Sequence, residues 1–224
     1  MGVADNITLL HKEIPQHVKI IAVSKTMPPA LIKEAYDAGH RAFGENRVQE
    51  LTGKQKSLPT DVEWHLIGHL QTNKVKYIVH FVHLIQSVDS LKLLSEINRE
   101  AARINRKIDC LLQIRIARED TKFGLSFADT NQVLHSGEYK DFQNIRITGL
   151  MGMATFTNNE DQIKEEFLSL ARYFEELKNR WFSHSETFKE LSMGMSGDYK
   201  LAIEAGSTMV RIGSLIFGER KYYP

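Results

Sequence analysis

Short apolar runs alternate along the chain with longer segments whose apolar residues recur every three or four positions. The short runs are rich in β-branched residues and have the length of buried strands. They lie at residues 18–24, 41–44, 63–68, 84–88, 108–116, 145–151, 190–195 and 209–217. We therefore predict a strand at each of these places.

The segments between these runs have the pattern of helices with one apolar face. Leu91, Leu94, Ile97, Ala101 and Ile104 show the spacing most clearly. Helices are predicted at residues 28–39, 46–58, 72–79, 91–104, 163–181 and 199–205, with an extra helix within residues 1–17, before the first strand. Residues 128–144 are polar and receive no assignment.

Repeated strand–helix alternation predicts a parallel sheet, because parallel strands need long crossover connections. Eight such units fit an α/β protein with a (β/α)8 TIM-type barrel and an added N-terminal helix. An open doubly wound sheet is the alternative. No segment rich in Pro, Gly and Ser divides the chain, so residues 1–224 are expected to form one domain.

Composition and charge argue against only a few broad classes of protein. The 224 residues include 29 basic and 28 acidic ones, and a net charge of +1 gives no reason to expect nucleic acid as a partner. No apolar run is long enough to predict a membrane span. The single cysteine, Cys110, excludes a disulfide within the chain and favours a reducing compartment. Residues 1–10 lack the features of a secretory signal, so we expect a cytoplasmic protein.

Lys25 stands directly after a predicted buried strand. In a barrel the loops after the carboxyl ends of the strands form the active site, so this amine would lie at the mouth. Desolvation there would lower its pKa and expose a nucleophile able to form a Schiff base with a carbonyl compound. A solvated lysine at the end of a strand is the plainer alternative.

The last two predicted strands also end in polar residues and glycines. Ser196 precedes a helix start, where free backbone N–H groups could bind phosphate, although Ser196 could equally be only a helix cap. Gly213, followed by Ser214, would let a ligand approach the backbone closely. Arg211 would face the barrel interior, either toward a ligand or in a structural ion pair.

No metal site is predicted. His65 and His69 are four residues apart, which on a strand is too far to chelate one ion. His80 and His83 are interpreted as helix-end or surface residues. The chain also has no Gly-rich dinucleotide or nucleoside-triphosphate motif.

Six ordered segments together resemble a known family. They read IAVSKT at 21–26, FGENRVQE at 43–50, WHLIGHLQTNK at 64–74, GLMGMA at 149–154, LSMGMSGD at 191–198 and VRIGSLIFG at 210–218. In this order they resemble the pyridoxal 5′-phosphate homeostasis protein family, the single-domain relatives of the alanine racemase barrel. The matching segments span nearly the whole chain.

The resemblance implies a barrel that holds pyridoxal 5′-phosphate (PLP). Lys25 matches the family's Schiff-base lysine, and Arg211 matches the arginine beside the pyridine nitrogen. Asn46 matches a position that lines the pocket, and the phosphate-binding positions are matched by Ser196, Gly213 and Ser214. The family usually has threonine where this chain has Ser214, and serine keeps the hydroxyl. The segment at 118–124 follows the family pattern only loosely, with Lys122 and Gly124 in place, so it is given no role.

The resemblance further implies a protein of PLP and amino-acid homeostasis, which we expect to carry the cofactor without catalysis. Arg211 cannot accept a proton at usable pH, so the ring nitrogen beside it would stay largely unprotonated and the ring would be a weak electron sink. The racemases that this family resembles take a second base from a second domain or the partner subunit, and 224 residues are expected to leave no room for that second domain. A monomer is expected, with apo-enzymes that use PLP as candidate partners. The alternatives are a PLP-dependent amino-acid racemase and a cofactor-free barrel with an aldolase-type lysine.

Overall fold

Eight parallel strands close into a barrel in the computed structural model, which describes residues 2–118 and 123–218. The strands are β1 (Lys19–Val23), β2 (Ala42–Glu45), β3 (Glu63–Leu66), β4 (Leu84–Val88), β5 (Ile108–Ile114), β6 (Ile145–Gly152), β7 (Glu190–Met195) and β8 (Met209–Ile212). Each pairs with the next along the chain, and β8 pairs with β1. The predicted (β/α)8 barrel is confirmed, and the open sheet is excluded.

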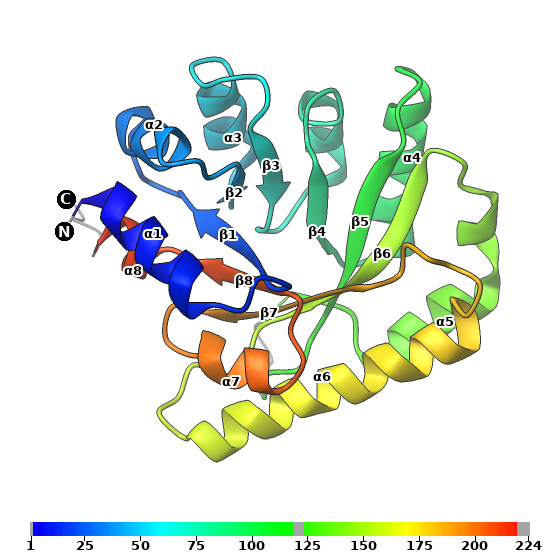
Figure 1. Ribbon diagram of the computed structural model, residues 1–224. Helices are drawn as coiled ribbons and strands as arrows, with labels where there is room; N and C mark the ends of the chain where they lie inside the picture. Colours follow the sequence, from blue (N-terminus) through cyan, green and yellow to red (C-terminus); the bar gives the residue numbers. More distant parts are fainter. Residues whose placement is uncertain (1, 119–122, 219–224) are drawn as a thin grey trace.

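Helices connect the strands and lie on the outside of the barrel (Figure 1). They are α1 (Val3–Glu13), α2 (Pro29–Asp37), α3 (Val48–Gln55), η1 (Thr72–Tyr77), α4 (Leu91–Ala102), α5 (Phe127–Ser136), η2 (Glu138–Asp141), α6 (Glu160–Trp181), α7 (Tyr199–Glu204) and α8 (Ser214–Phe217). The helix α1 precedes the first strand, as predicted. Its buried residues Val3, Ile7 and Leu10 join the main core, and the helix contacts α2 and α8.

Two apolar clusters lie on opposite faces of the strands. The larger one joins strand residues such as Ile20 and Ala22 to the inner faces of the helices. The smaller one takes buried residues from six of the strands, namely Ile21, Ala42, Leu84, Leu111, Met151 and Met209. Side chains of a strand alternate between its faces, so the smaller cluster fills the inside of the barrel. The barrel is thus packed through its middle, and a ligand can enter only near its ends.

The last apolar run differs from its prediction. A strand was expected over 209–217, but β8 ends at Ile212 and residues Ser214–Phe217 form the short helix α8. The amides of Ile216 and Phe217 donate to the Gly213 carbonyl, which begins this helical turn. A short apolar run fits a buried strand and a buried helical turn equally well, so its period could not separate them.

Two other segments were assigned incompletely. Residues 72–77 form a 3₁₀ helix, and the unassigned stretch 128–144 contains η2 and all of α5 except its first residue. The start of α5 has a capping box, in which Ser126 accepts from the Asp129 amide and the Asp129 carboxylate accepts from the Ser126 amide. The S-x-x-D spacing is a helix-start signal that the sequence carried.

Within the described parts of the chain, no helix has both the length and the apolar character needed to cross a bilayer. Cys110 is buried in β5, and burial raises the pKa of its thiol. The assignment of residues 1–224 to one domain stays a prediction.

Candidate cofactor site

All of the predicted site residues line one cavity of about 620 Å³ at the carboxyl ends of the strands. Lys25 follows β1, Asn46 follows β2, and Ser196 follows β7. Arg211 lies in β8, with Gly213 and Ser214 directly after it. The barrel therefore gathers residues that are far apart in sequence around one space.

The half-buried Lys25 stands in a turn whose backbone is held on both sides. Before it, the Ser24 carbonyl accepts a hydrogen bond from Lys54 Nζ at 2.7 Å. After it, the Thr26 amide donates to the Glu50 carboxylate. Thr26 has φ +67°, a left-handed conformation that a β-branched residue rarely adopts. Contacts from α3 thus maintain a strained turn that aims Lys25 at the cavity.

The Lys54 ammonium is itself buried in this network. Its Nζ lies 2.7 Å from Glu45 Oε1 and 2.6 Å from Glu50 Oε1, and the Lys54 side chain is 7% exposed. Burial raises the pKa of the Glu45 carboxyl, while Lys54 and the Ser24 hydroxyl oppose that rise. Glu45 Oε2 is buried and has no hydrogen-bond partner in the described structure. Removing Lys54 would leave a buried carboxylate poorly compensated.

Arg211 is a buried cation, 3% exposed, at the inner wall of the cavity. One of its nitrogens donates to Ser192 Oγ at 2.6 Å and another to the Gly152 carbonyl at 2.8 Å. Burial lowers the pKa of Arg211 to about 10, and the charge of Asp198 acts against this shift. The guanidinium therefore stays charged at neutral pH, so it can donate hydrogen bonds but not accept a proton.

Behind Arg211 runs a chain of buried hydrogen bonds. Ser192 Oγ donates to Gln86 Oε1 at 2.7 Å, and Gln86 Nε2 lies 2.9 Å from His65 Nδ1. Ser192, Gln86 and His65 have no exposed surface. The chain fixes the Arg211 side chain from behind, because its members are locked by packing inside the barrel.

The predicted phosphate positions meet at the junction of β7 and β8. The Gly213 amide donates to Ser196 Oγ at 3.1 Å. Ser214, which is exposed, and Gly197 line the same cavity. Two hydroxyls, a donor type that suits a phosphate, thus lie beside the backbone of Gly197 and Gly213.

Asn46 is placed by a close approach of two backbones. A Cβ on Gly68 would lie 2.4 Å from the Asn46 carbonyl oxygen, so only glycine lets the chain after β3 pass there. In the sequence, Asn46 comes shortly after the strand predicted at 41–44, and Gly68 ends the strand predicted at 63–68. Their contact depends on the register between β2 and β3, which local sequence does not encode.

His69 also lines the cavity, although the sequence predicted no role for it there. His69 Nδ1 lies 3.1 Å from Asp89 Oδ2, and the His69 ring stacks on Phe123 with centroids 4.2 Å apart. His69 and Phe123 both line the cavity. Lys122, the family-like position in the loop before Phe123, lies outside the described residues.

The histidines that were weighed for a metal site do not pair as considered. His69 meets Asp89, whereas His65 lies beside Glu63 and His83 on the amino-terminal side of β3 and β4. His83 is exposed at the start of β4. The prediction of no metal site rests on the spacing of the histidines along the chain. That spacing does not reveal the group of Glu63, His65 and His83, which the fold brings together.

Comparison with known proteins assigns the chain to a family. The sequence profile of the alanine racemase N-terminal domain matches residues 2–221. A protein of Aquifex aeolicus (strain VF5) named pyridoxal phosphate homeostasis protein is 40% identical over 206 residues, which are 91% of this chain and 88% of that protein. The chain belongs to the pyridoxal phosphate homeostasis protein family. The Escherichia coli (strain K12) member of this family is 37% identical over 212 residues, 93% of this chain and 88% of that protein.

Solved structures agree with this assignment. PipY of Synechococcus elongatus PCC7942 without PLP has a TM-score of 0.90 and 37% identity, and the match covers 97% of this chain and all of that one. The PLP-bound form of PipY has a TM-score of 0.87 with 36% identity. Alanine racemase of Clostridium difficile 630 shares the fold at 13% identity, with a TM-score of 0.77 over 56% of its own length.

The buried ion pair near Lys25 leads to a stability prediction. Lys54→Met should lower the free energy of unfolding by about 3–5 kcal/mol, because it leaves the buried Glu45 carboxylate without its cationic partner. Replacing both partners, in Lys54→Met/Glu45→Leu, should recover much of this loss. Urea denaturation of the three proteins measures the difference.

The loss of stability caused by Lys54→Met should depend on pH. Burial raises the pKa of Glu45 in the wild type, and Lys54→Met should raise it further because Lys54 opposes that rise. The loss of stability in the variant should therefore be smallest below about pH 4.3, where Glu45 is protonated in both the folded and the unfolded chain, and should grow as the pH rises above that value. Lys33→Met, which removes an exposed pair with Asp37, is the control and should change stability by about 0.5 kcal/mol or less. A Lys54→Met protein as stable as wild type at pH 7 would contradict the role given to this pair.

Proposed function

We propose that this protein binds PLP in the cavity at the carboxyl ends of its strands and acts in PLP and amino-acid homeostasis. The observation that carries the proposal is the meeting of Lys25, Arg211 and Ser196 around one cavity. Family membership supports it, since relatives at 37–40% identity are named pyridoxal phosphate homeostasis proteins. The PLP-bound structure of PipY supports it independently.

The donor groups fit the three polar parts of PLP. An amine at Lys25 suits the aldehyde, to which it would be joined as a Schiff base. The Arg211 guanidinium can donate a hydrogen bond to the pyridine nitrogen. Ser196, Ser214 and the backbone at Gly213 would bind the phosphate, and Asn46 would line the pocket. PLP, when bound, supplies an aldehyde and an electron-withdrawing ring.

Arg211 supports a carrier rather than a catalyst. Its charge is buried and held by Ser192 and Gly152, so the group that would lie beside the ring nitrogen is a fixed donor. A fixed cation there opposes protonation of the ring nitrogen and limits the stabilisation of carbanions. We therefore propose that the protein holds PLP without catalysing a reaction of its own.

The setting proposed for this role is the cytoplasm. A lone buried thiol at Cys110 needs no oxidising compartment.

We further propose that the protein is a monomer and passes PLP to apo-enzymes that need it. The open position of the cavity at one end of the barrel would give a recipient access to the cofactor.

The first test is the visible spectrum of the purified protein with PLP. The wild type should show a yellow absorption band, and borohydride should fix the cofactor on the peptide that contains Lys25, as read by mass spectrometry. Lys25→Ala should lose both signals, because no other amine is proposed to reach the aldehyde.

Lys33→Ala is the matched control, since Lys33 is half exposed on α2 and away from the cavity lining. It should keep the band and the label. A band that survives in Lys25→Ala, or a label on another lysine, would overturn the proposed attachment.

The phosphate positions give a second test. Ser196→Ala should weaken binding of PLP by roughly 10- to 100-fold, the value of one charge-assisted hydrogen bond. The same change should leave the affinity for pyridoxal, which has no phosphate, nearly unaltered. Fluorescence titration of wild type and variant with both compounds measures the four affinities. Equal losses for both compounds would place Ser196 away from the phosphate.

A PLP-dependent amino-acid racemase is the second candidate function. The observation that favours it is His69, which is oriented by Asp89 on the cavity rim and could serve as a second base. The Asp–His arrangement fixes the imidazole as in other general bases. This candidate requires proton exchange at the α-carbon of an amino acid.

Exchange in deuterium oxide separates the two candidates. With PLP and a panel of amino acids, we expect no α-deuterium above the level seen with free PLP, by proton NMR or mass spectrometry. Exchange at useful turnover that is lost in His69→Asn would replace the carrier by the racemase.

A further inference from the structure

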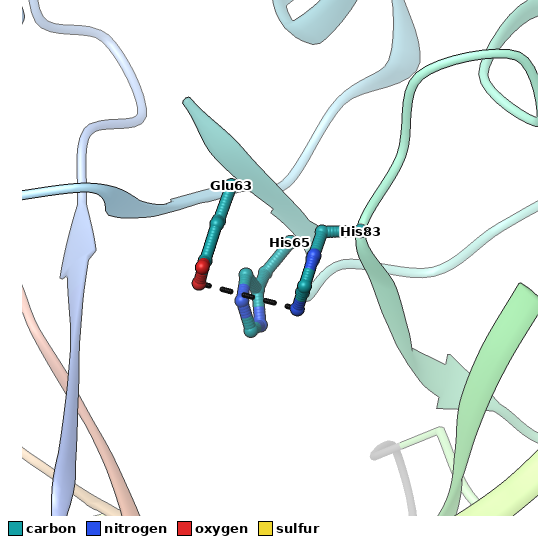
Figure 2. Close-up of side chains that lie close together, drawn as sticks. All are labelled: Glu63, His65 and His83. Carbon is teal, nitrogen blue, oxygen red and sulfur yellow. Dashed lines mark ion pairs between the residues drawn. The ribbon is translucent and has the colours of Figure 1, made fainter. Parts of the chain in front are cut away.

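A second cluster of polar side chains lies at the amino-terminal end of the barrel strands, away from the PLP cavity. Glu63 and His65 are two residues apart on β3, so both point to the same face. His83 directly precedes β4, the neighbouring strand. Figure 2 shows the ends of Glu63 and His83 turned toward each other, with the His65 ring beside the line between them.

The three ligand atoms are close enough to share an ion. One carboxylate oxygen and two imidazole nitrogens lie within 4.8 Å of one another. His83 Nε2 is 3.9 Å from Glu63 Oε2. Ligands of a tetrahedral zinc ion at about 2.0–2.1 Å lie roughly 3.3 Å apart, so small side-chain rotations would complete the site.

His65 adds an independent indication. It is completely buried, and its Nε2 has no hydrogen-bond partner among the described residues. A buried polar atom without a partner is rare and calls for an explanation such as an ion. The other nitrogen, Nδ1, is 2.9 Å from the Gln86 amide. Coordination through Nε2 requires the proton of His65 to lie on Nδ1, so the Gln86 amide must turn when the ion binds. Gln86 then donates to Ser192 Oγ instead of accepting from it, and the hydrogen bond from Ser192 to Gln86 is lost.

We propose that Glu63, His65 and His83 form a binding site for a divalent cation of the zinc class. Two imidazoles and one carboxylate are a zinc ligand set that leaves a fourth position for water. Glu63 and His83 are partly exposed, so that position opens to solvent. The ion would join the start of β3 to the start of β4.

One neighbouring charge opposes the ion. Lys19 Nζ lies 2.6 Å from Glu63 Oε2 and must move outward when a cation binds. The Lys19 side chain is 39% exposed, and its flexible stem allows this movement. Near His83, the charges of Asp109 and Arg106 act in opposite directions. Lys19 therefore sets the affinity, and its removal should strengthen binding.

The test is calorimetric titration of the whole chain, without PLP, with zinc chloride. Wild type should bind one ion for each chain. His83→Asn should bind at least about 100-fold more weakly, since even second-shell partners contribute roughly 10- to 100-fold. Lys19→Met should bind about tenfold more tightly, because a unit charge beside the ligand is removed.

His11→Asn is the matched control. His11 Nε2 lies 3.3 Å from Nδ1 of the buried His40, and this pair, which lines a hollow together with Lys19 and Glu63, could bind zinc adventitiously. This variant should keep the wild-type affinity, and the visible spectrum of bound Co²⁺ should change in His83→Asn and not in His11→Asn. Absence of one-to-one binding, or binding unaffected by His83→Asn, would overturn the proposal.

Discussion

The pairing of β1 with β8 closes the barrel, and the arrangement of the site depends on it. In this pair Ile21 lies opposite Arg211, and Ala22 lies opposite Ile212. The register brings the end of β1, where Lys25 follows, next to Gly213 at the end of β8. A Cβ on Gly213 would lie 3.3 Å from the Val23 carbonyl, which shows how closely the two ends approach. Without closure, the amine and the guanidinium would lie at opposite edges of an open sheet.

The two ends of the barrel have different chemistry because its middle is filled with apolar side chains. At the carboxyl ends, α3 holds the backbone on either side of Lys25 from outside the barrel, and Ser192 holds Arg211 from inside. The polar chain from Arg211 through Ser192 and Gln86 reaches His65, which faces the other end. Binding and positioning thus rest on rigid strands and buried hydrogen bonds, as a site of defined geometry requires.

The sequence predicted the barrel because strand–helix alternation is a local property that repeats. It also predicted the site residues at strand ends, since barrels place function there. Those residues do line one cavity, while their individual roles stay predictions. Neither Lys54 nor Gln86 was anticipated, because each acts through contacts across elements. In isolation Lys54 resembles any helix lysine, and its burial against Glu45 follows only from how α3 packs on the barrel.

A crystal structure of the protein grown with PLP would show directly whether Lys25 holds the cofactor in this cavity. We expect electron density that is continuous from Lys25 Nζ to the cofactor, with the phosphate at Ser196 and Ser214. We also expect Arg211 to remain hydrogen-bonded to Ser192 and to face the pyridine nitrogen. Cofactor density joined to another lysine, or an empty cavity at saturating PLP, would contradict the proposed attachment of PLP to Lys25.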